Sequence, residues 1–152
     1  MKEIPVEILL YTAGLFDNAA YSICWNGMEG SAYRNLNIAI SLTCKTGKAH
    51  AQLVKCFTYL KLRKYKLSGS YLIVHGYNAL RFNALINPYL IEKKEASDIL
   101  EKFRLLQPEP TRKRGEGRDE VIYEKKIKLA HELRASNLKY NPKHWQGKKL
   151  NL

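Results

Sequence analysis

Residues 5–23 read PVEILLYTAGLFDNAAYSI, and the periodicity of the apolar side chains changes within this stretch. The first part, within residues 3–17, has apolar side chains at helical spacing, and Pro5 near its first turn is typical of a helix start. Residues 21–26, YSICWN, instead predict a strand. We therefore expect a helix that leads directly into a strand, with the small residues Ala13 and Gly14 in an otherwise bulky helix.

The next elements continue the same alternation of helices and strands. Residues 33–44 alternate apolar and polar side chains, which predicts a half-buried strand whose outer face is polar. A helix is expected after Thr46, and the segments YLIVH and KYKL around Ser68-Gly69-Ser70 predict a hairpin. Helices are then expected over residues 78–87 and 93–106.

The order of elements predicts an α+β fold of the form αββαββα with an antiparallel sheet, followed by an extra C-terminal helix. Residues 108–117, PEPTRKRGEG, are rich in proline, glycine and charge, which is typical of a linker. We expect a core domain over residues 1–107 and a C-terminal helix with a basic tail over residues 118–152.

The composition bounds the function. The chain has 152 residues, 45% of them hydrophobic, so one domain with a real core is expected. Membrane insertion and secretion are disfavoured, because apolar runs are short and Glu3, Pro5 and Glu7 interrupt the N-terminal segment. Three cysteines without paired spacing indicate neither a disulfide framework nor a zinc module. An intracellular protein of the cytoplasm or an organelle matrix is expected.

The charge points to a polyanionic partner. The formal net charge is +12, and residues 30–91 contain nine Lys and Arg but no Asp or Glu. Such a field attracts nucleic acid, and a two-stranded ribbon fits the major groove of duplex DNA. Asn35 and Asn37 are suited to reading base edges there. A generally basic surface, or a merely solvated sheet face, stays open as the alternative.

The segment Thr12–Ala20 resembles the nine-position LAGLIDADG motif of homing endonucleases, with the Ala-Gly-Leu-Phe-Asp core at residues 13–17. Residues 87–96 are similar to the segment before the late helix of that family, and the resemblance covers roughly residues 5–106. It implies a homodimer with one motif per chain and a long, pseudo-palindromic site of about twenty base pairs of double-stranded DNA. It also implies Mg-dependent hydrolysis of both strands and a role in intron homing.

The resemblance also implies roles for individual residues. The position of the metal-binding acid falls on Ala19, so the ligand is lost, although the backbone carbonyl of Asn18 remains. Asp17 matches an acid better interpreted as structural than as a ligand. The active-site lysine falls on Lys93, or on Lys94 if the segment slips by one residue. The solvent-orienting position falls on Cys44, and the dimer interface on Leu9, Ala13, Gly14 and Phe16.

The residues expected to contact DNA lie on the strands, around them and in the tail. They are Tyr21, Ile23, Trp25, Tyr33, Arg34, Asn35, Asn37, Ser41, Lys45, Arg63, Lys64, Tyr65, Lys66, Tyr71, His75, Lys139 and Lys143.

Three interpretations follow for the function. The first is a homing endonuclease that binds DNA but cleaves it poorly, because Ala19 replaces the acid by engineering or by natural decay. The second is a non-catalytic nucleic-acid binder on the same scaffold, such as an RNA maturase or a repressor. The third is an unrelated basic RNA-binding module with an accidental motif.

Overall fold

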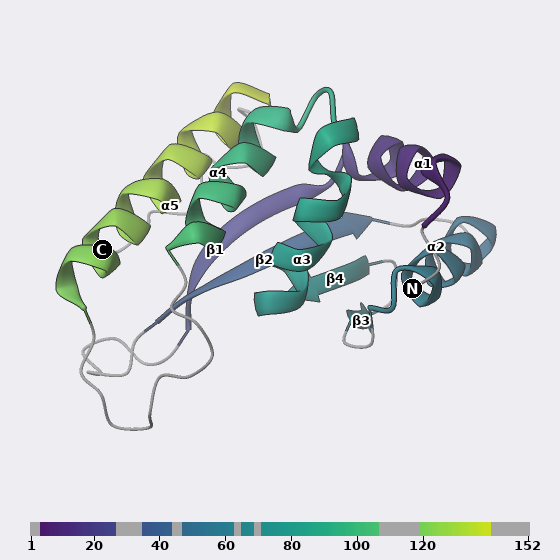
Figure 1. The fold of residues 1–152 in the computed structure, drawn as a ribbon, viewed down its shortest axis with the longest axis horizontal. Coiled ribbons are helices and arrows are strands. Elements are labelled where there is room, and N and C mark those ends of the chain that lie inside the picture. Colours follow the sequence, from purple (N-terminus) through teal and green to yellow (C-terminus); the bar gives the residue numbers. More distant parts are fainter. Residues whose placement is uncertain are drawn as a thin grey trace.

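The structure is a computed structural model that describes residues 4–26, 35–43, 47–62, 65–68, 71–106 and 119–140. The expected order of elements is confirmed, including the extra C-terminal helix (Figure 1). The elements are α1 Val6–Phe16, β1 Ala20–Asn26, β2 Asn35–Thr43, α2 Gly47–Tyr59, β3 Tyr65–Ser68, β4 Tyr71–His75, α3 Gly76–Ile86, the short helix η1 Asn87–Tyr89, α4 Lys94–Leu105 and α5 Glu120–Tyr140. The linker at 108–117 lies outside the described residues, and the division into domains stays a prediction.

The four strands form one antiparallel sheet in the order β1-β2-β4-β3. Helices α3, α4 and α5 lie over one face of this sheet (Figure 1). The strand side chains on that face are buried, which is the alternation expected of a sheet with one covered face. They include Tyr21 of β1, Leu36, Ile38, Ile40 and Leu42 of β2, and Leu72 and Val74 of β4.

An aromatic cluster joins three helices at the centre of the core. The ring of Phe16 lies 4.6 Å from that of Phe82 in α3 and 6.0 Å from that of Phe57 in α2, both in edge-to-face arrangements. All three rings are fully buried. Because edge-to-face pairs add stability beyond the burial of area, this cluster fixes the C-terminal end of α1 against the rest of the domain.

The C-terminal helix packs against the domain core. Leu129 and Leu133 belong to the same hydrophobic cluster as the sheet residues. The side-chain amide of Asn137 donates a hydrogen bond of 2.7 Å to the backbone carbonyl of Tyr21, on the edge strand β1. Among the described residues, no helix is both long enough and apolar enough to cross a membrane.

Candidate nucleic-acid interface

The second face of the sheet, which we call the outer face, carries smaller and more polar side chains from β1, β2 and β4. The register pairs Cys24 with Asn37, Ala39 with His75, and Ser41 with Ile73, so these residues share a face across three strands. The side chains of Cys24 and His75 are exposed, and those of Asn37, Ser41 and Ile73 are partly exposed. The outer face is therefore a surface of short polar and small apolar groups.

Local hydrogen bonds orient side chains on this face. The Ser22 hydroxyl donates to the carbonyl oxygen of Ala39 across the strand pair, at 3.1 Å. The side-chain oxygen of Asn37 accepts a hydrogen bond of 2.9 Å from the backbone N–H of Ile38. The Asn37 amide is thereby held on the outer face. Of the residues expected to contact DNA, Asn37, Ser41, Tyr71 and His75 lie on this face, and their contact with DNA stays a prediction.

Two expected DNA contacts on β1 are wrong. Tyr21 is fully buried and pairs with Ile40, and its hydroxyl donates to the carbonyl of Phe16 at 3.4 Å. Burial raises the pKa of the Tyr21 hydroxyl, and the charge of Asp17 raises it further. Ile23 pairs with Ile38 and packs against the core. Both side chains lie on the covered face, because the turn after α1 sets which residues of β1 point outward.

Ser22 and Cys24 of β1 lie on the outer face together with Ala20, and the sequence interpretation missed them as DNA contacts. The signal was present, since small residues at 20, 22 and 24 alternate with larger apolar ones. Burial raises the pKa of the Cys24 thiol, although the side chain is exposed. Thr43 and Ile73 were missed for a similar reason, since neither residue type stands out as a base-reading group.

Other expected contacts are not gathered at the outer face. Lys139 lies on α5 in the helix layer, where its ammonium forms an ion pair of 3.1 Å with Glu95, so the structure does not bring it to the outer face. The remaining predictions fall on residues, or on side chains, outside the described part of the chain. These are Tyr33, Arg34, Cys44, Lys45, Arg63, Lys64 and Lys143, and the side chains of Trp25, Asn35, Tyr65 and Lys66.

The end of α1 differs from the expected metal site. Ala19, at the expected position of the acid, is only 2% exposed and belongs to the hydrophobic core, so its methyl group packs inside the chain. Ala20, the first residue of β1, is exposed. The carboxylate of Asp17 accepts hydrogen bonds from the backbone N–H groups of Ile91 and Lys93. Asp17 therefore has the structural role expected of it.

The described donor set does not fit Mg²⁺, which prefers carboxylate oxygens. The side chains of Ala19 and Ala20 are methyl groups, and the Asp17 carboxylate already binds two backbone N–H groups. Among the described residues no group of three His, Cys, Asp or Glu side chains is placed to hold a metal ion. Asn18, the other residue expected at this site, is exposed and has a backbone carbonyl that could still bind a cation.

The two candidate lysines have different surroundings. The Lys94 ammonium bonds Asn87 at 2.6 Å and Asp98 at 2.7 Å, so it joins η1 to α4. Burial alone would raise the pKa of the Asp98 carboxyl, but hydrogen bonds from Asn87 and Lys94 and the charges of Lys94 and Lys102 lower it overall. Lys93 lies beside the end of α1, where its backbone N–H bonds Asp17.

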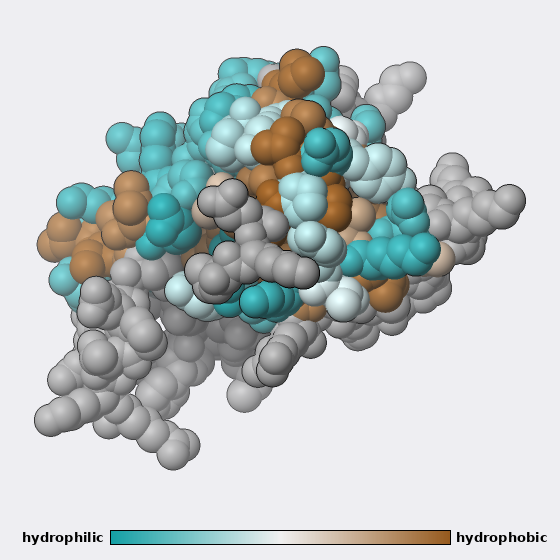
Figure 2. Space-filling view, turned by 45° about the vertical axis from the view of Figure 1, so that its right-hand side comes forward, coloured by the Kyte–Doolittle hydropathy of each residue, from teal (hydrophilic) through white to brown (hydrophobic). Residues whose placement is uncertain are grey.

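Most of the expected dimer interface is wrong. Leu9, Ala13 and Phe16 are buried within the chain's own core, at 9%, 0% and 0% exposure. The exposed side of α1 instead presents Gly14 together with Val6, Leu10 and Tyr11. A Cβ added at Gly14 meets no atom within 4 Å. Figure 2, turned to bring this side forward, shows hydrophobic surface gathered there.

No protein-family model and no curated protein matches the sequence significantly. Solved structures do match. The homing endonuclease I-CvuI, solved with its target, superimposes with a TM-score of 0.66 at 13% identity, covering 84% of this chain and 80% of that one. The fold is that of the LAGLIDADG homing endonucleases.

Two further structures with the homing endonuclease fold agree. The archaeal intron-encoded homing endonuclease I-Vdi141I, complexed with DNA, has a TM-score of 0.62 at 14% identity and covers 84% of this chain and 82% of that one. The LAGLIDADG homing endonuclease I-GzeII, in complex with its DNA target, has a TM-score of 0.58 at 12% identity over 89% of this chain. This chain spans about half of I-GzeII, covering 49% of its length.

Proposed function

We propose that this chain binds double-stranded DNA site-specifically through the outer face, as a protein of homing endonuclease type whose own strand cleavage is impaired. The observation that carries the proposal is the outer face itself, a polar sheet surface without described helices over it, in a chain with a net charge of +12. Homing endonucleases with the same fold have been solved with DNA.

The chemistry of the outer face suits the major groove. A sheet enters that groove, and short polar side chains such as Asn37 and Ser41 reach base edges while Lys and Arg contact phosphates. The amide of Asn37 can donate to and accept from adenine once its local bond to Ile38 is exchanged. Binding is then strongly salt-dependent, because each neutralised phosphate releases a counterion.

A second copy of the chain completes the proposed DNA-binding unit. The apolar stripe of Val6, Leu10 and Tyr11 on α1 flanks Gly14, whose missing side chain lets another helix approach closely. A symmetric contact through α1 places two outer faces in line. The combined site is then pseudo-palindromic and about twenty base pairs long, or about one helical turn for each copy.

The described residues provide few of the groups that DNA cleavage would need. Among the described residues no group of three His, Cys, Asp or Glu side chains is placed to hold a metal ion, so Mg-dependent hydrolysis at a normal enzymatic rate is not expected of this chain. This absence favours a second candidate function on the same scaffold, a non-catalytic nucleic-acid binder such as an RNA maturase or a repressor. The two candidates differ in the nucleic acid that binds most tightly.

The test is selection of bound duplexes from a random pool at moderate salt, beside a competition with structured RNA. A symmetric consensus is expected, and His75→Ala on the outer face should weaken binding to it. Lys128→Ala is the matched control, because Lys128 is exposed on α5. The absence of any consensus would overturn the proposal. Stronger, structure-specific RNA binding would instead support the maturase.

A further inference from the structure

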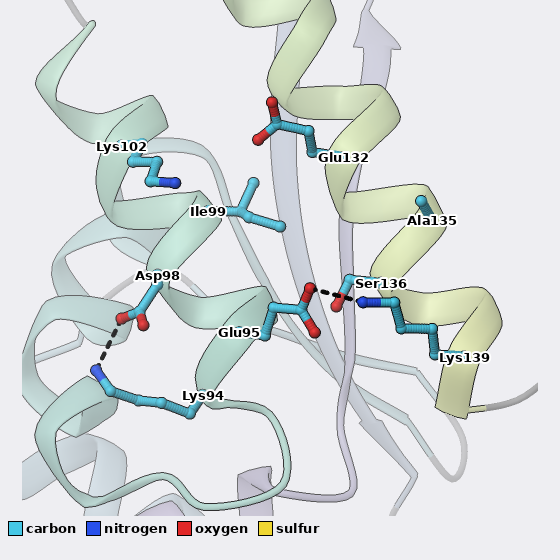
Figure 3. A pocket seen from close by; sticks show the side chains of 9 residues that line it. All are labelled: Lys94, Glu95, Asp98, Ile99, Lys102, Glu132, Ala135, Ser136 and Lys139. Atoms are coloured by element: carbon cyan, nitrogen blue, oxygen red, sulfur yellow. Dashed lines mark hydrogen bonds and ion pairs between the residues drawn. The ribbon is translucent and has the colours of Figure 1, made fainter.

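A groove of about 630 Å³ lies between α4 and α5, in the helix layer (Figure 3). Ile99 and Ala135 contribute its apolar surface. The remaining lining residues are charged or polar: Lys94, Glu95, Asp98, Lys102, Glu132, Ser136 and Lys139. Its size falls within the range of about 300–1,000 Å³ that is usual for ligand sites.

The charges of the groove are balanced, unlike those of the whole chain. The chain has 26 Lys and Arg against 14 Asp and Glu, whereas the groove has three lysines and three carboxylates. The negative groups oppose the binding of a polyanion. The groove therefore selects a different partner from the one that the net charge attracts.

Two ion pairs lie within the groove, and two further charged side chains that line it take part in neither. Lys94 pairs with Asp98 at 2.7 Å, and Lys139 pairs with Glu95 at 3.1 Å. Lys102 and Glu132, one on each helix, form no ion pair among the described residues. Their charged ends both point into the space between the helices (Figure 3). Lys102 acts on Asp98 through its charge but forms no ion pair with it, so its ammonium and the Glu132 carboxylate can each pair with an opposite charge on a ligand.

A buried hydroxyl gives an independent indication of a ligand. Ser136 is 1% exposed, and its hydroxyl has no hydrogen-bond partner in the described part of the chain. In Figure 3 it lies beside the Glu95–Lys139 ion pair in the groove. Since a buried polar atom without a partner is unfavourable, a ligand group that bonds this hydroxyl gains affinity.

We propose that the α4–α5 groove binds a short peptide segment of a partner protein that carries one acidic and one basic side chain. The acidic side chain pairs with Lys102 and the basic one with Glu132. Apolar groups of the segment cover Ile99 and Ala135, and a backbone polar group bonds Ser136. Because the groove is in the helix layer and the outer face is on the other side of the sheet, the chain can bind the peptide and DNA at the same time.

The test uses the full chain, isotope-labelled for amide NMR, and short capped peptides with one glutamate and one lysine separated by alanines, in both orders. Amide shifts are expected within residues 94–102 and 132–139. Lys102→Met and Glu132→Gln should each weaken binding about fivefold, whereas the matched control Lys128→Met, elsewhere on α5, should not. Exchanging both charges, Lys102→Glu with Glu132→Lys, should restore affinity for the peptide of opposite order.

Three outcomes would overturn the proposal. One is that no peptide of the panel shifts the groove amides. Another is that an uncharged glutamine analogue shifts them as strongly. The third is that inorganic phosphate or a DNA duplex shifts the same amides with equal affinity, which would make the groove an anion site. DNA affinity measured in parallel keeps this result separate from the proposal for the outer face.

Discussion

The carboxylate of Asp17 accepts a hydrogen bond of 3.2 Å from the backbone N–H of Lys93, and both of its oxygens also lie within 3.2 Å of the N–H of Ile91. Asp17 follows the last residue of α1, where the helix dipole disfavours a negative charge. The bonds to the two N–H groups offset this cost. They tie the end of the motif to the start of α4, 76 residues later.

Asp17→Ala is therefore expected to lower the free energy of unfolding by about 1–3 kcal/mol, the usual range for hydrogen bonds to a charged group. Asp17→Asn should lower the free energy of unfolding by less than Asp17→Ala does, because the amide oxygen of Asn can still accept a hydrogen bond. Urea unfolding measures both, with the exposed neighbour Asn18→Ala as control. Equal stability of Asp17→Ala and the unmodified chain would show that these hydrogen bonds contribute nothing to the free energy of unfolding.

Gly14→Ala should affect the single chain and the proposed dimer in opposite directions. The added methyl group meets no atom of its own chain, so the folded chain should gain about 1 kcal/mol from helix propensity. The same methyl group separates two α1 helices, so the dimer should dissociate at higher concentration. Sedimentation over a dilution series checks this, and Leu10→Glu should give a stable monomer. A dimer unaffected by either change would exclude the α1 contact.

Aspartate should be tolerated at position 20 and not at position 19. Ala19→Asp buries a carboxylate in the core and is expected to cost roughly 3 kcal/mol or more. Ala20→Asp leaves the carboxylate exposed and should change stability by about 0.5 kcal/mol. If Mg-dependent nicking can be restored, Ala20→Asp should restore it. The measurement is Mg-dependent nicking of a plasmid that contains the selected site. Activity only with Ala19→Asp would contradict this prediction.

Cys24 reports directly on the outer face. In a Cys44→Ser background, alkylation should modify Cys24 but not the buried Cys56 in the folded chain. Because burial raises the pKa of the Cys24 thiol from 9.0, the rate should be slow at neutral pH and increase as the pH rises towards and above that value. Bound duplex should protect Cys24. An unchanged alkylation rate at saturating DNA would place the DNA elsewhere.

Asp98 should stabilise the fold only above acidic pH. Its pKa in the folded chain is lowered from 3.8, so the unfolded chain binds the proton more tightly. The stabilisation is therefore fully present above the unfolded value and is lost as the pH falls from 3.8 through the lower, folded value. The stability difference between the unmodified chain and Asp98→Asn should shrink in that window. Glu124→Gln, on the exposed side of α5, is the control in urea unfolding, and a difference constant with pH would contradict the assignment.

The sequence predicted the elements well where local periodicity decided them. The alternation of Leu36, Ile38, Ile40 and Leu42 identified the covered face of β2, and all four are buried. The same rule applied to β1 would have placed Tyr21 inside. The prediction of a DNA contact placed it outside instead, because the number of residues between the helix and the strand does not give the geometry of the turn that joins them.

The helix α1 was ambiguous for a different reason. Apolar residues occur on every side of α1. Periodicity alone therefore does not distinguish the side that packs on the chain's own core from the side that is exposed. Leu9 and Phe16 belong to the first and Leu10 to the second, and only the packing of α2 and α3 distinguishes them. The Ser136 hydroxyl and the charge balance of the α4–α5 groove likewise arise from residues distant in sequence.

The bond from Asn137 to the Tyr21 carbonyl spans 116 residues and covers part of the exposed edge of β1. During synthesis on the ribosome, that edge emerges long before the helix that protects it. Until α5 arrives, the nascent chain presents a strand able to pair with a neighbouring polypeptide. This protection of β1 is therefore complete only when α5 has left the exit tunnel.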